Sequence, residues 1–375
     1  MTRPDPDAVR EKFATARAEL SSALIERDQE IDLVLTALLA REHVLLVGPP
    51  GCAKSLLLEA VMRWLGGKTF TCLLTRFTTP EELFGPVSVA GLKEDRYRRI
   101  TTGKLPEADG CFLDEVFKGS SAILNTLLRL LNERVFDPGD GVPIKCPLRL
   151  CVAASNEWLG QQENGAELQA VFDRFLLRKS VRPIASAAGR HRLLWAADHT
   201  PRLTTGVTPA ELDLAHSGAM ALGWSAEAKE AFEAVLRELS NEGIRPGDRR
   251  QFKAVGACKA FAYLCGADRV EPEHLEVAAH CLWDAPEEQP QKAAEVVARI
   301  ANPTGMRVNQ LLLECEQVVS GCDVRNLSSA ATAAAKLGEI DRQLAGLKGD
   351  ARVERARSHV KDQIKRLKLA SLEAI

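Results

Sequence analysis

Long apolar runs, a charged excess of one sign and paired cysteines are all missing from this chain of 375 residues. No uncharged apolar run reaches the roughly 20 residues that a membrane-spanning helix needs, so we expect no membrane insertion. The first residues are charged and contain no apolar core, so we expect no secretory signal. The net charge of −2 argues against a nucleic-acid footprint over the whole protein, and nucleic acid is not the expected partner.

The ten cysteines are scattered, without Cys-x-x-Cys spacing and without histidines at metal-ligand spacing. Several lie inside apolar runs, where a free thiol behaves as a small hydrophobic side chain. This usage excludes a disulfide framework and a zinc site of the common types. We therefore expect reduced thiols and a cytoplasmic location.

Aromatic residues are absent from 291–375. Apolar residues keep a 3–4–3 spacing at 337–347 and again at 353–367, which predicts two antiparallel helices packed by narrow aliphatic seams. With 308–319 they would form a three-helix bundle. Residues 336–368 carry ten Lys or Arg against five Asp or Glu. This excess is compatible with nucleic acid or an acidic partner, although such runs are more often solvated faces.

The chain is 46% hydrophobic and 27% charged, as in ordinary globular proteins, and is long enough for two or three domains. Two helices are expected within 7–41, and the polar stretch 25–30 between them is either a helix entry or a wall for a nucleotide base. Strand and helix patterns then alternate over 43–181, which predicts a parallel sheet with helices on both faces. Hairpins are predicted at 87–100, inserted into a helix, and at 135–144.

The alternation begins with residues 43–58, an apolar run of strand length followed by a Gly/Pro-rich turn and a helix-forming run. A helix start offers unpaired N–H groups and partial positive charge, and therefore binds phosphate. Gly48 and Gly51 let the backbone curl so that N–H groups point inward. Lys54 would meet the β- and γ-phosphates, and the Ser55 hydroxyl would ligate Mg²⁺.

The residues predicted to cradle the phosphates are Gly48, Pro49, Pro50, Gly51, Cys52, Ala53, Lys54, Ser55 and Leu56. One of them departs from the usual G-x-x-x-x-G-K-S pattern, because Ala53 stands where the last glycine would be. A methyl group is tolerated there if the residue has right-handed helical angles. We therefore expect such angles at this position.

A second chemical stretch is the apolar run 110–113 that ends in Asp114 and Glu115. Acidic strand ends are common, but this one follows Lys54 by about 60 residues in the same α/β pattern. Asp114 would hold Mg²⁺ through water, and Glu115 would act as the general base toward the attacking water.

Asn156 ends another buried run, 148–155. An asparagine at a strand end is usually a turn residue. Beside the phosphate-binding loop and the acidic strand it is well placed to orient water against the γ-phosphate, which is the role we predict.

From about residue 185 the strand pattern stops, and a four-helix lid is expected to about 285. Arg249 and Arg250 begin one of its helices, where cations are unfavourable for the helix dipole. This placement predicts that they face a bound anion; the alternative is a pair of solvated arginines.

Together these motifs resemble the AAA+ ATPases of the MoxR type, in particular the RavA-like branch, over roughly residues 15–285. The matching motifs are 48–55 (GPPGCAKS), 78–86 (TTPEELFGP), 112–115 (FLDE), 123–128 (ILNTLL), 153–157 (AASNE) and 247–250 (GDRR). Alanine before Lys54 is common in this branch. The RavA pattern breaks in the C-terminal region, where no β-rich insertion is found.

The resemblance implies an α/β fold: a P-loop AAA+ parallel-sheet domain (1–185), an all-α lid (186–285) and a C-terminal helical hairpin or three-helix bundle (291–375). The hairpins at about 85–101 and 135–145 match the helix-2 insert and the pre-sensor-1 hairpin, which would face a pore or a client. The resemblance also assigns roles to single residues: Asn156 is sensor 1, Arg174 is the arginine finger supplied in trans, and Arg249, or else Arg250, is sensor 2.

The same resemblance implies an ATPase that uses ATP and Mg²⁺ in a homo-oligomeric ring, typically a hexamer. Such enzymes are chaperone-like remodellers of a client protein, often with a partner that bears a von Willebrand A domain. Two further functions stay open. The first is a DNA-handling motor, which only the basic C-terminal region favours. The second is a non-catalytic nucleotide switch, which the presence of Glu115, Asn156 and Arg174 disfavours.

Overall fold

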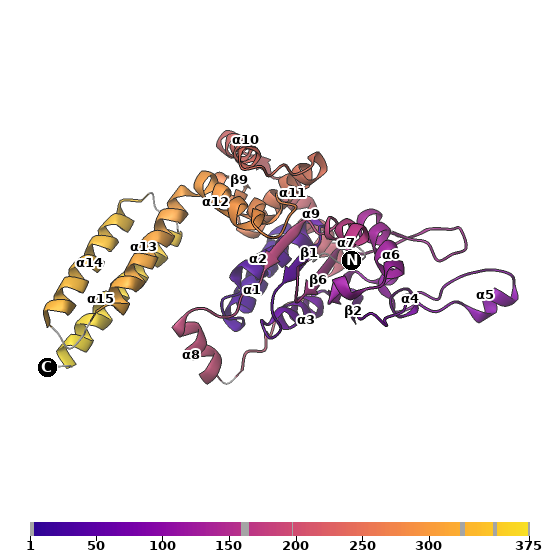
Figure 1. Ribbon diagram of the computed structural model, residues 1–375, viewed down its shortest axis with the longest axis horizontal. Helices are drawn as coiled ribbons and strands as arrows, with labels where there is room; N and C mark the ends of the chain where they lie inside the picture. The colour runs from indigo at the N-terminus through magenta and orange to yellow at the C-terminus, as the bar shows by residue number, and fades with distance from the viewer. Residues whose placement is uncertain (1–3, 159–164, 197, 323–326, 348–350, 374–375) are drawn as a thin grey trace. The chain divides into compact units, whose positions relative to one another are not determined.

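The computed structural model describes residues 4–158, 165–196, 198–322, 327–347 and 351–373 (Figure 1). The chain divides into two compact units, Met1–Ala294 and Glu295–Ile375. Each unit is described by itself below.

A five-stranded parallel sheet is the centre of the first unit, in the order β2-β3-β6-β1-β7. The strands are β1 (Val44–Val47), β2 (Thr69–Leu73), β3 (Gly110–Asp114), β6 (Leu150–Ser155) and β7 (Leu177–Ser180). Every residue of β1 and β6 is buried, as expected for strands covered on both faces. The predicted α/β fold with a parallel sheet is confirmed.

This strand order determines where the chemistry lies. Because β1, β3 and β6 are neighbours and run parallel, with Val47 beside Ser155 and Leu113 beside Ala153, their carboxyl ends meet at one edge of the sheet. The glycine-rich loop after β1, the acidic pair at the end of β3 and Asn156 after β6 therefore come together.

Helices alternate with the strands in this part of the chain, as the sequence pattern predicts. They are α1 (Pro6–Ala23), α2 (Asp28–Ala40), α3 (Lys54–Trp64), α4 (Pro80–Phe84), α6 (Ser121–Glu133), α7 (Gly165–Phe172) and α8 (Ala187–Trp195), with short 3-10 turns η1 (Leu105–Glu107) and η2 (Val116–Lys118). In α6 the buried residues recur on one face, from Ile123 to Leu131, as the apolar spacing requires. Helix α8 was not predicted, because Gly189 is its one buried residue and it therefore has no apolar period.

The hairpin prediction is confirmed for one segment and wrong in part for the other. Strands β4 (Val135–Phe136) and β5 (Ile144–Lys145) pair antiparallel. In the 87–100 segment a single antiparallel bridge joins Val87 to Arg99, and the tip is the short helix α5 (Val89–Lys93). The reason is Ser88, whose hydroxyl accepts a hydrogen bond from the Gly91 N–H at 3.1 Å and so caps a helix in place of the expected strand.

The predicted lid contains α9 (Pro209–Ala221), α10 (Ala226–Asn241), α11 (Asp248–Leu264) and η3 (Pro272–His280). The fourth element is a 3-10 helix, and the all-helical expectation missed the two-residue parallel strands β8 (Gly223–Trp224) and β9 (Arg269–Val270), which are too short to show a period. Helix α12 (Gln289–Ala301) follows the lid.

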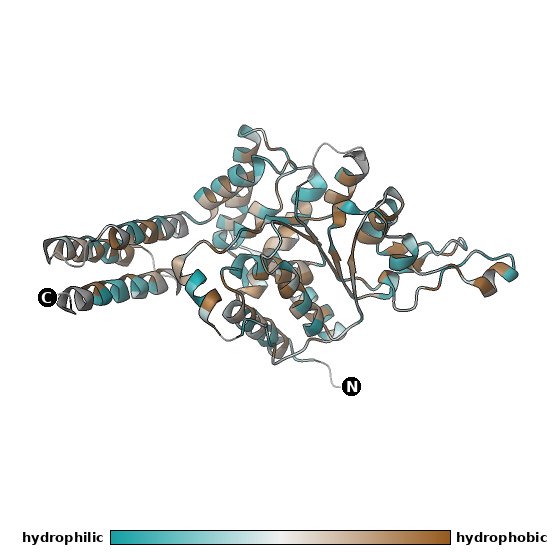
Figure 2. Ribbon diagram, turned by 60° about the horizontal axis from the view of Figure 1, so that its bottom comes forward, coloured by the Kyte–Doolittle hydropathy of each residue, from teal (hydrophilic) through white to brown (hydrophobic). Residues whose placement is uncertain are grey.

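The second unit is a three-helix bundle of α13 (Pro303–Ser320), α14 (Leu327–Ala345) and α15 (Ala351–Glu373). Leu311, Leu337, Leu344 and Val360 are fully buried in its aliphatic core. Brown and teal residues alternate along these helices in Figure 2, as expected for amphipathic helices. Of the two arrangements expected, hairpin or bundle, the bundle is observed. Among the described residues, no helix is both long enough and apolar enough to cross a membrane.

Candidate active site

The loop between β1 and α3 is shaped by the absence of side chains at two positions. The Gly48 N–H donates to the Ser155 carbonyl at 3.0 Å, and a Cβ atom at Gly48 would overlap the carbonyl oxygen of Val181. Gly51 has a φ of 81°, which favours glycine. Helix α3 begins at Lys54 without a side-chain cap, so its first N–H groups are free to bind an anion.

Ala53, directly before Lys54, does not have the right-handed angles that we expected. Its φ is 59° and its ψ is 20°, which is left-handed. A left-handed conformation costs a residue with a Cβ atom about 1–2 kcal/mol. The backbone at position 53 therefore has the left-handed conformation that favours glycine, although the residue there is alanine.

Replacing Ala53 by glycine is therefore expected to raise the free energy of unfolding by up to about 1 kcal/mol, after the larger entropy of the unfolded glycine chain is subtracted. Denaturant titration of the full chain measures this. Ala60→Gly in the middle of α3 is the matched control and should lower stability by about 1 kcal/mol. A loss of stability in Ala53→Gly would contradict the strain argument.

Lys54 projects into the loop itself. Its ammonium donates to the carbonyls of Gly48, Pro49 (3.2 Å) and Ser155 (3.4 Å) and to Oδ1 of Asn156 (3.3 Å). Burial lowers the pKa of Lys54, and the charges of Asp114 and Glu115 act in the opposite direction. The cation is thus held where a phosphate in this loop would lie.

The predicted general base and the predicted water-orienting residue are in direct contact. Nδ2 of Asn156 donates to Oε1 of Glu115, and the ammonium of Lys118 lies 3.4 Å from Oε2. Glu115 has a left-handed φ of 52°, and its N–H donates to Oδ1 of Asp114 at 3.0 Å. The structure thus joins Lys54, Asn156 and Glu115 in one chain of contacts.

Ser55 is half-buried on the first turn of α3, and Asp114 is half-buried at the end of β3. Hydroxyl and carboxylate oxygens are the ligand types that Mg²⁺ prefers, and Mg²⁺ commonly takes one or two carboxylates together with substrate phosphates and water. Within the described residues no group of three or more His, Cys, Asp or Glu side chains forms a metal cage. The donors present fit a metal ion that is bound mainly through a nucleotide.

Arg27 contacts the glycine-rich loop, and the sequence analysis did not predict this contact. Its buried guanidinium donates to the carbonyls of Cys52 (3.0 Å) and Arg182 (2.8 Å), so it ties the 25–30 stretch to the glycine-rich loop and to the end of the sheet. This contact favours the second of the two interpretations of that stretch, a wall beside the nucleotide. A single arginine in a polar segment carries no sequence signal that distinguishes the two.

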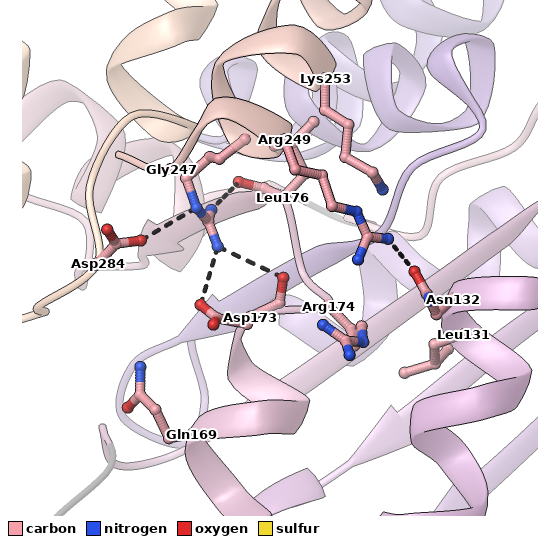
Figure 3. A pocket seen from close by; sticks show the side chains of 11 residues that line it. Leu131, Asn132, Gln169, Asp173, Arg174, Leu176, Gly247, Arg249, Lys253 and Asp284 are labelled. Carbon is pink, nitrogen blue, oxygen red and sulfur yellow. Dashed lines mark hydrogen bonds and ion pairs between the residues drawn. The ribbon is translucent and has the colours of Figure 1, made fainter. Parts of the chain in front are cut away.

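A second site lies between the α/β core and α11 (Figure 3). Its cavity has a volume of about 250 Å³, and none of the residues that line it belongs to the loop 48–56. Four cationic side chains line it: Arg174, Arg249, Arg250 and Lys253. Among the described residues, Nε of Arg174 is buried without a hydrogen-bond partner.

The two arginines at the start of α11 differ in their surroundings. Arg250 is buried and forms ion pairs with Asp173 (3.2 Å) and Asp284 (3.1 Å), whereas Arg249 is exposed and donates to Oδ1 of Asn132. The alternative of two solvated arginines is therefore wrong for Arg250. Both arginines lie with Arg174 in the second site and do not line the loop that holds Lys54.

Lys253 also lines the second site and was missed. Its ammonium lies 2.6 Å from Oε2 of Glu42, and burial lowers its pKa. It stands four residues after Arg249, so the two share one face of α11. From this spacing, Lys253 could have been predicted to lie on the same side of α11 as Arg249.

Comparisons with known proteins agree with the observed fold. Residues 11–213 match the family model for the MoxR domain of MoxR-vWA-beta-propeller ternary systems, and residues 230–296 match an AAA lid domain. An uncharacterized protein of Methanocaldococcus jannaschii is 41% identical over 75% of this chain and 74% of its own. The protein MoxR of Methylorubrum extorquens is 27% identical over 74% and 89%. A crystal structure from Cytophaga hutchinsonii aligns with a TM-score of 0.63 at 17% identity, over 79% of this chain and 96% of that one, which supports the fold.

Proposed function

The chain belongs to the MoxR family of AAA+ ATPases, and from that premise we propose that it hydrolyses ATP in a homo-oligomeric ring to remodel a client protein. The observation that carries this proposal is the contact chain of Lys54, Asn156 and Glu115 at the carboxyl edge of the sheet. A phosphate-binding cation, a water-orienting amide and a carboxylate base are the groups that hydrolysis of a γ-phosphate needs.

Each of these groups has one task in the proposed reaction. Residues 48–56 surround the phosphates. The Lys54 ammonium exchanges its hydrogen bonds to the loop carbonyls for hydrogen bonds to phosphate oxygens. Ser55 and Asp114 would hold Mg²⁺, which would supply positive charge against the phosphates. Asn156 orients the attacking water, and Glu115 accepts its proton.

The second site supports hydrolysis between subunits. Arg250 and Lys253 are already paired with carboxylates, whereas within the described residues no ion pair is formed by Arg174 or Arg249, so these two arginines are the ones that an anion would meet. The chain's own glycine-rich loop does not line that site. We assign the anion to the nucleotide of a neighbouring copy, with Arg174 as the arginine finger. Because Arg249 and Arg250 line the same site, we assign them to that neighbour's nucleotide as well, in place of their own. A closed ring, for which we propose six copies, satisfies every such interface.

The nucleotide site is tested by Lys54→Ala. Removal of a charge-assisted contact to phosphate costs about 1.5–3 kcal/mol, so ATP binding should weaken by about 10- to 100-fold. Equilibrium titration with a fluorescent ATP analogue measures this, with Lys68→Ala as the control because that lysine is exposed and pairs with Glu107. Unchanged affinity in Lys54→Ala would remove the loop from the nucleotide site.

The partner that we propose is a protein with a von Willebrand A domain, because the matched family model describes MoxR domains of ternary systems with that domain. The segments that would meet a client are the 87–100 insert and the β4–β5 hairpin, which expose Val89, Leu92 and Val142.

The proposal that the chain belongs to the RavA-like branch is supported by the motif residues alone. We place the protein in the cytoplasm, because no disulfide joins any of its ten cysteines, all of which lie within the described residues.

The partner is tested with Glu115→Gln protein, which should stay in the ATP-bound state. Purified from its own cells with ATP, it should retain a von Willebrand A protein that Lys54→Ala protein does not retain. Nucleic acid that survives moderate salt in place of a protein would favour the DNA-handling motor.

A further inference from the structure

A buried arginine with no role in the proposed reaction lies next to the turn that carries Arg174. Arg178 is the second residue of the edge strand β7, and its side chain is fully buried. Burial of a cation costs several kcal/mol unless its N–H groups find acceptors. The acceptors that Arg178 has found therefore indicate what the residue does.

Its guanidinium holds the main chain on both sides of Arg174. Nε donates to the carbonyl of Phe175 at 2.8 Å, and Nη2 donates to the carbonyl of Phe172 at 3.1 Å. The guanidinium also lies 3.8 Å from the ring centroid of Phe172, in cation–π geometry. One side chain thus determines the path of the turn at 172–175.

Asp173 extends this network into the helical part of the first unit. Its Oδ1 accepts from Nη2 of Arg178 at 3.3 Å and from Nη2 of Arg250 at 3.2 Å. Nη1 of Arg178 donates to the carbonyl of Trp283 at 2.8 Å, and Nε of Arg250 pairs with Asp284. The residue before Arg174 is therefore tied to α11 and to the segment after η3.

The network keeps its charge at neutral pH. Burial lowers the pKa of Arg178 to about 9, and the neighbouring charge of Arg250 acts in the same direction. The guanidinium therefore stays protonated near pH 7 and keeps all its donors. A neutral side chain of similar length would leave the carbonyls of Phe172, Phe175 and Trp283 without this donor.

We propose that Arg178, together with Asp173, is a positioning residue that orients Arg174 toward the nucleotide of a neighbouring subunit and couples that orientation to the lid. The inference rests on the proposed function, because it requires Arg174 to act in trans. Arg178 would contact neither the nucleotide nor the attacking water, and would act only through the 172–175 turn.

The test uses mixed oligomers of full-length chains. Arg174→Ala chains keep the nucleotide loop, Lys54→Ala chains keep Arg174, and mixing the two should restore turnover at the interfaces between them. Arg178→Met is then added to one partner at a time. In the Lys54→Ala chain it should cut the restored turnover by about tenfold or more, because a misplacement of 1 Å can cost about 100-fold. In the Arg174→Ala chain it should change turnover less than about twofold.

This asymmetry separates positioning from folding, because a general loss of structure would lower turnover in both arrangements. Equal losses would overturn the proposal, and so would full turnover with Arg178→Met in the Lys54→Ala chain. Asp173→Asn is the second variant: its side chain is 46% exposed, so the substitution does not open the core, and it should show the same asymmetry with a smaller loss.

Arg149→Met is the matched control. Arg149 ties the core to α9 through Asp109 and Asp213 without contacting the 172–175 turn, so turnover should be retained in both arrangements. If the unmodified pair restores no turnover in mixed oligomers verified by mass, the proposed trans arrangement fails and this inference fails with it. Restoration in that pair, unaffected by Arg178→Met, overturns the positioning role alone.

Discussion

Replacement of Arg174 by alanine should lower ATP turnover by about 10³-fold or more while ATP binding to the same chain stays unchanged. An arginine finger stabilises charge that develops in the transition state, and in the proposed ring it serves the neighbour's nucleotide. Its Nε already lacks a partner, so the substitution leaves no new unsatisfied group behind and stability should stay close to that of the parent.

Phosphate release at saturating ATP and equilibrium binding of an ATP analogue measure the two halves of this prediction. Arg129→Ala is the control, because Arg129 is exposed on α6 and pairs only with Glu133 among the contacts described. Parental turnover in Arg174→Ala would exclude Arg174 as the finger. A parallel loss of ATP affinity would place it at its own chain's nucleotide.

Glu115→Gln should lower turnover by about 10²- to 10⁴-fold, because the amide cannot accept a proton from water. The side chain keeps its size and an oxygen that can accept from Asn156, so ATP should bind and persist unhydrolysed. Single-turnover assays measure the chemical step apart from product release, and Glu133→Gln on the surface of α6 controls for loss of one carboxylate. Equal single-turnover rates would mean that Glu115 is not the base.

The nucleotide loop and its partners were predictable because their signals are local. A strand pattern, a turn and Lys-Ser lie within 16 residues, and Glu115 and Asn156 each end an apolar run. In a parallel sheet such ends converge whatever the details of packing. Lys54, Asn156 and Glu115 therefore meet in space although 102 residues separate the first from the second.

Other features depend on tertiary contacts and were not predictable. Ala53 is left-handed because the loop must turn toward α3, and an alanine carries no sign of that demand. Arg178 lies in the middle of a strand pattern, where a cationic residue is normally predicted to face solvent. Its burial requires acceptors from Phe172, Phe175 and Trp283, and the last lies 105 residues away.

The aromatic-free core of the C-terminal bundle also separates the two units spectroscopically. Every intrinsic fluorophore belongs to the first unit: Trp64, Trp158, Trp195, Trp224, Trp283, Tyr97 and Tyr263. Near-ultraviolet absorption and emission will therefore record melting of the ATPase unit alone, while far-ultraviolet dichroism also records the bundle. Because the indole of Trp283 lies in contact with Phe172, its emission provides an optical report on the turn that presents Arg174.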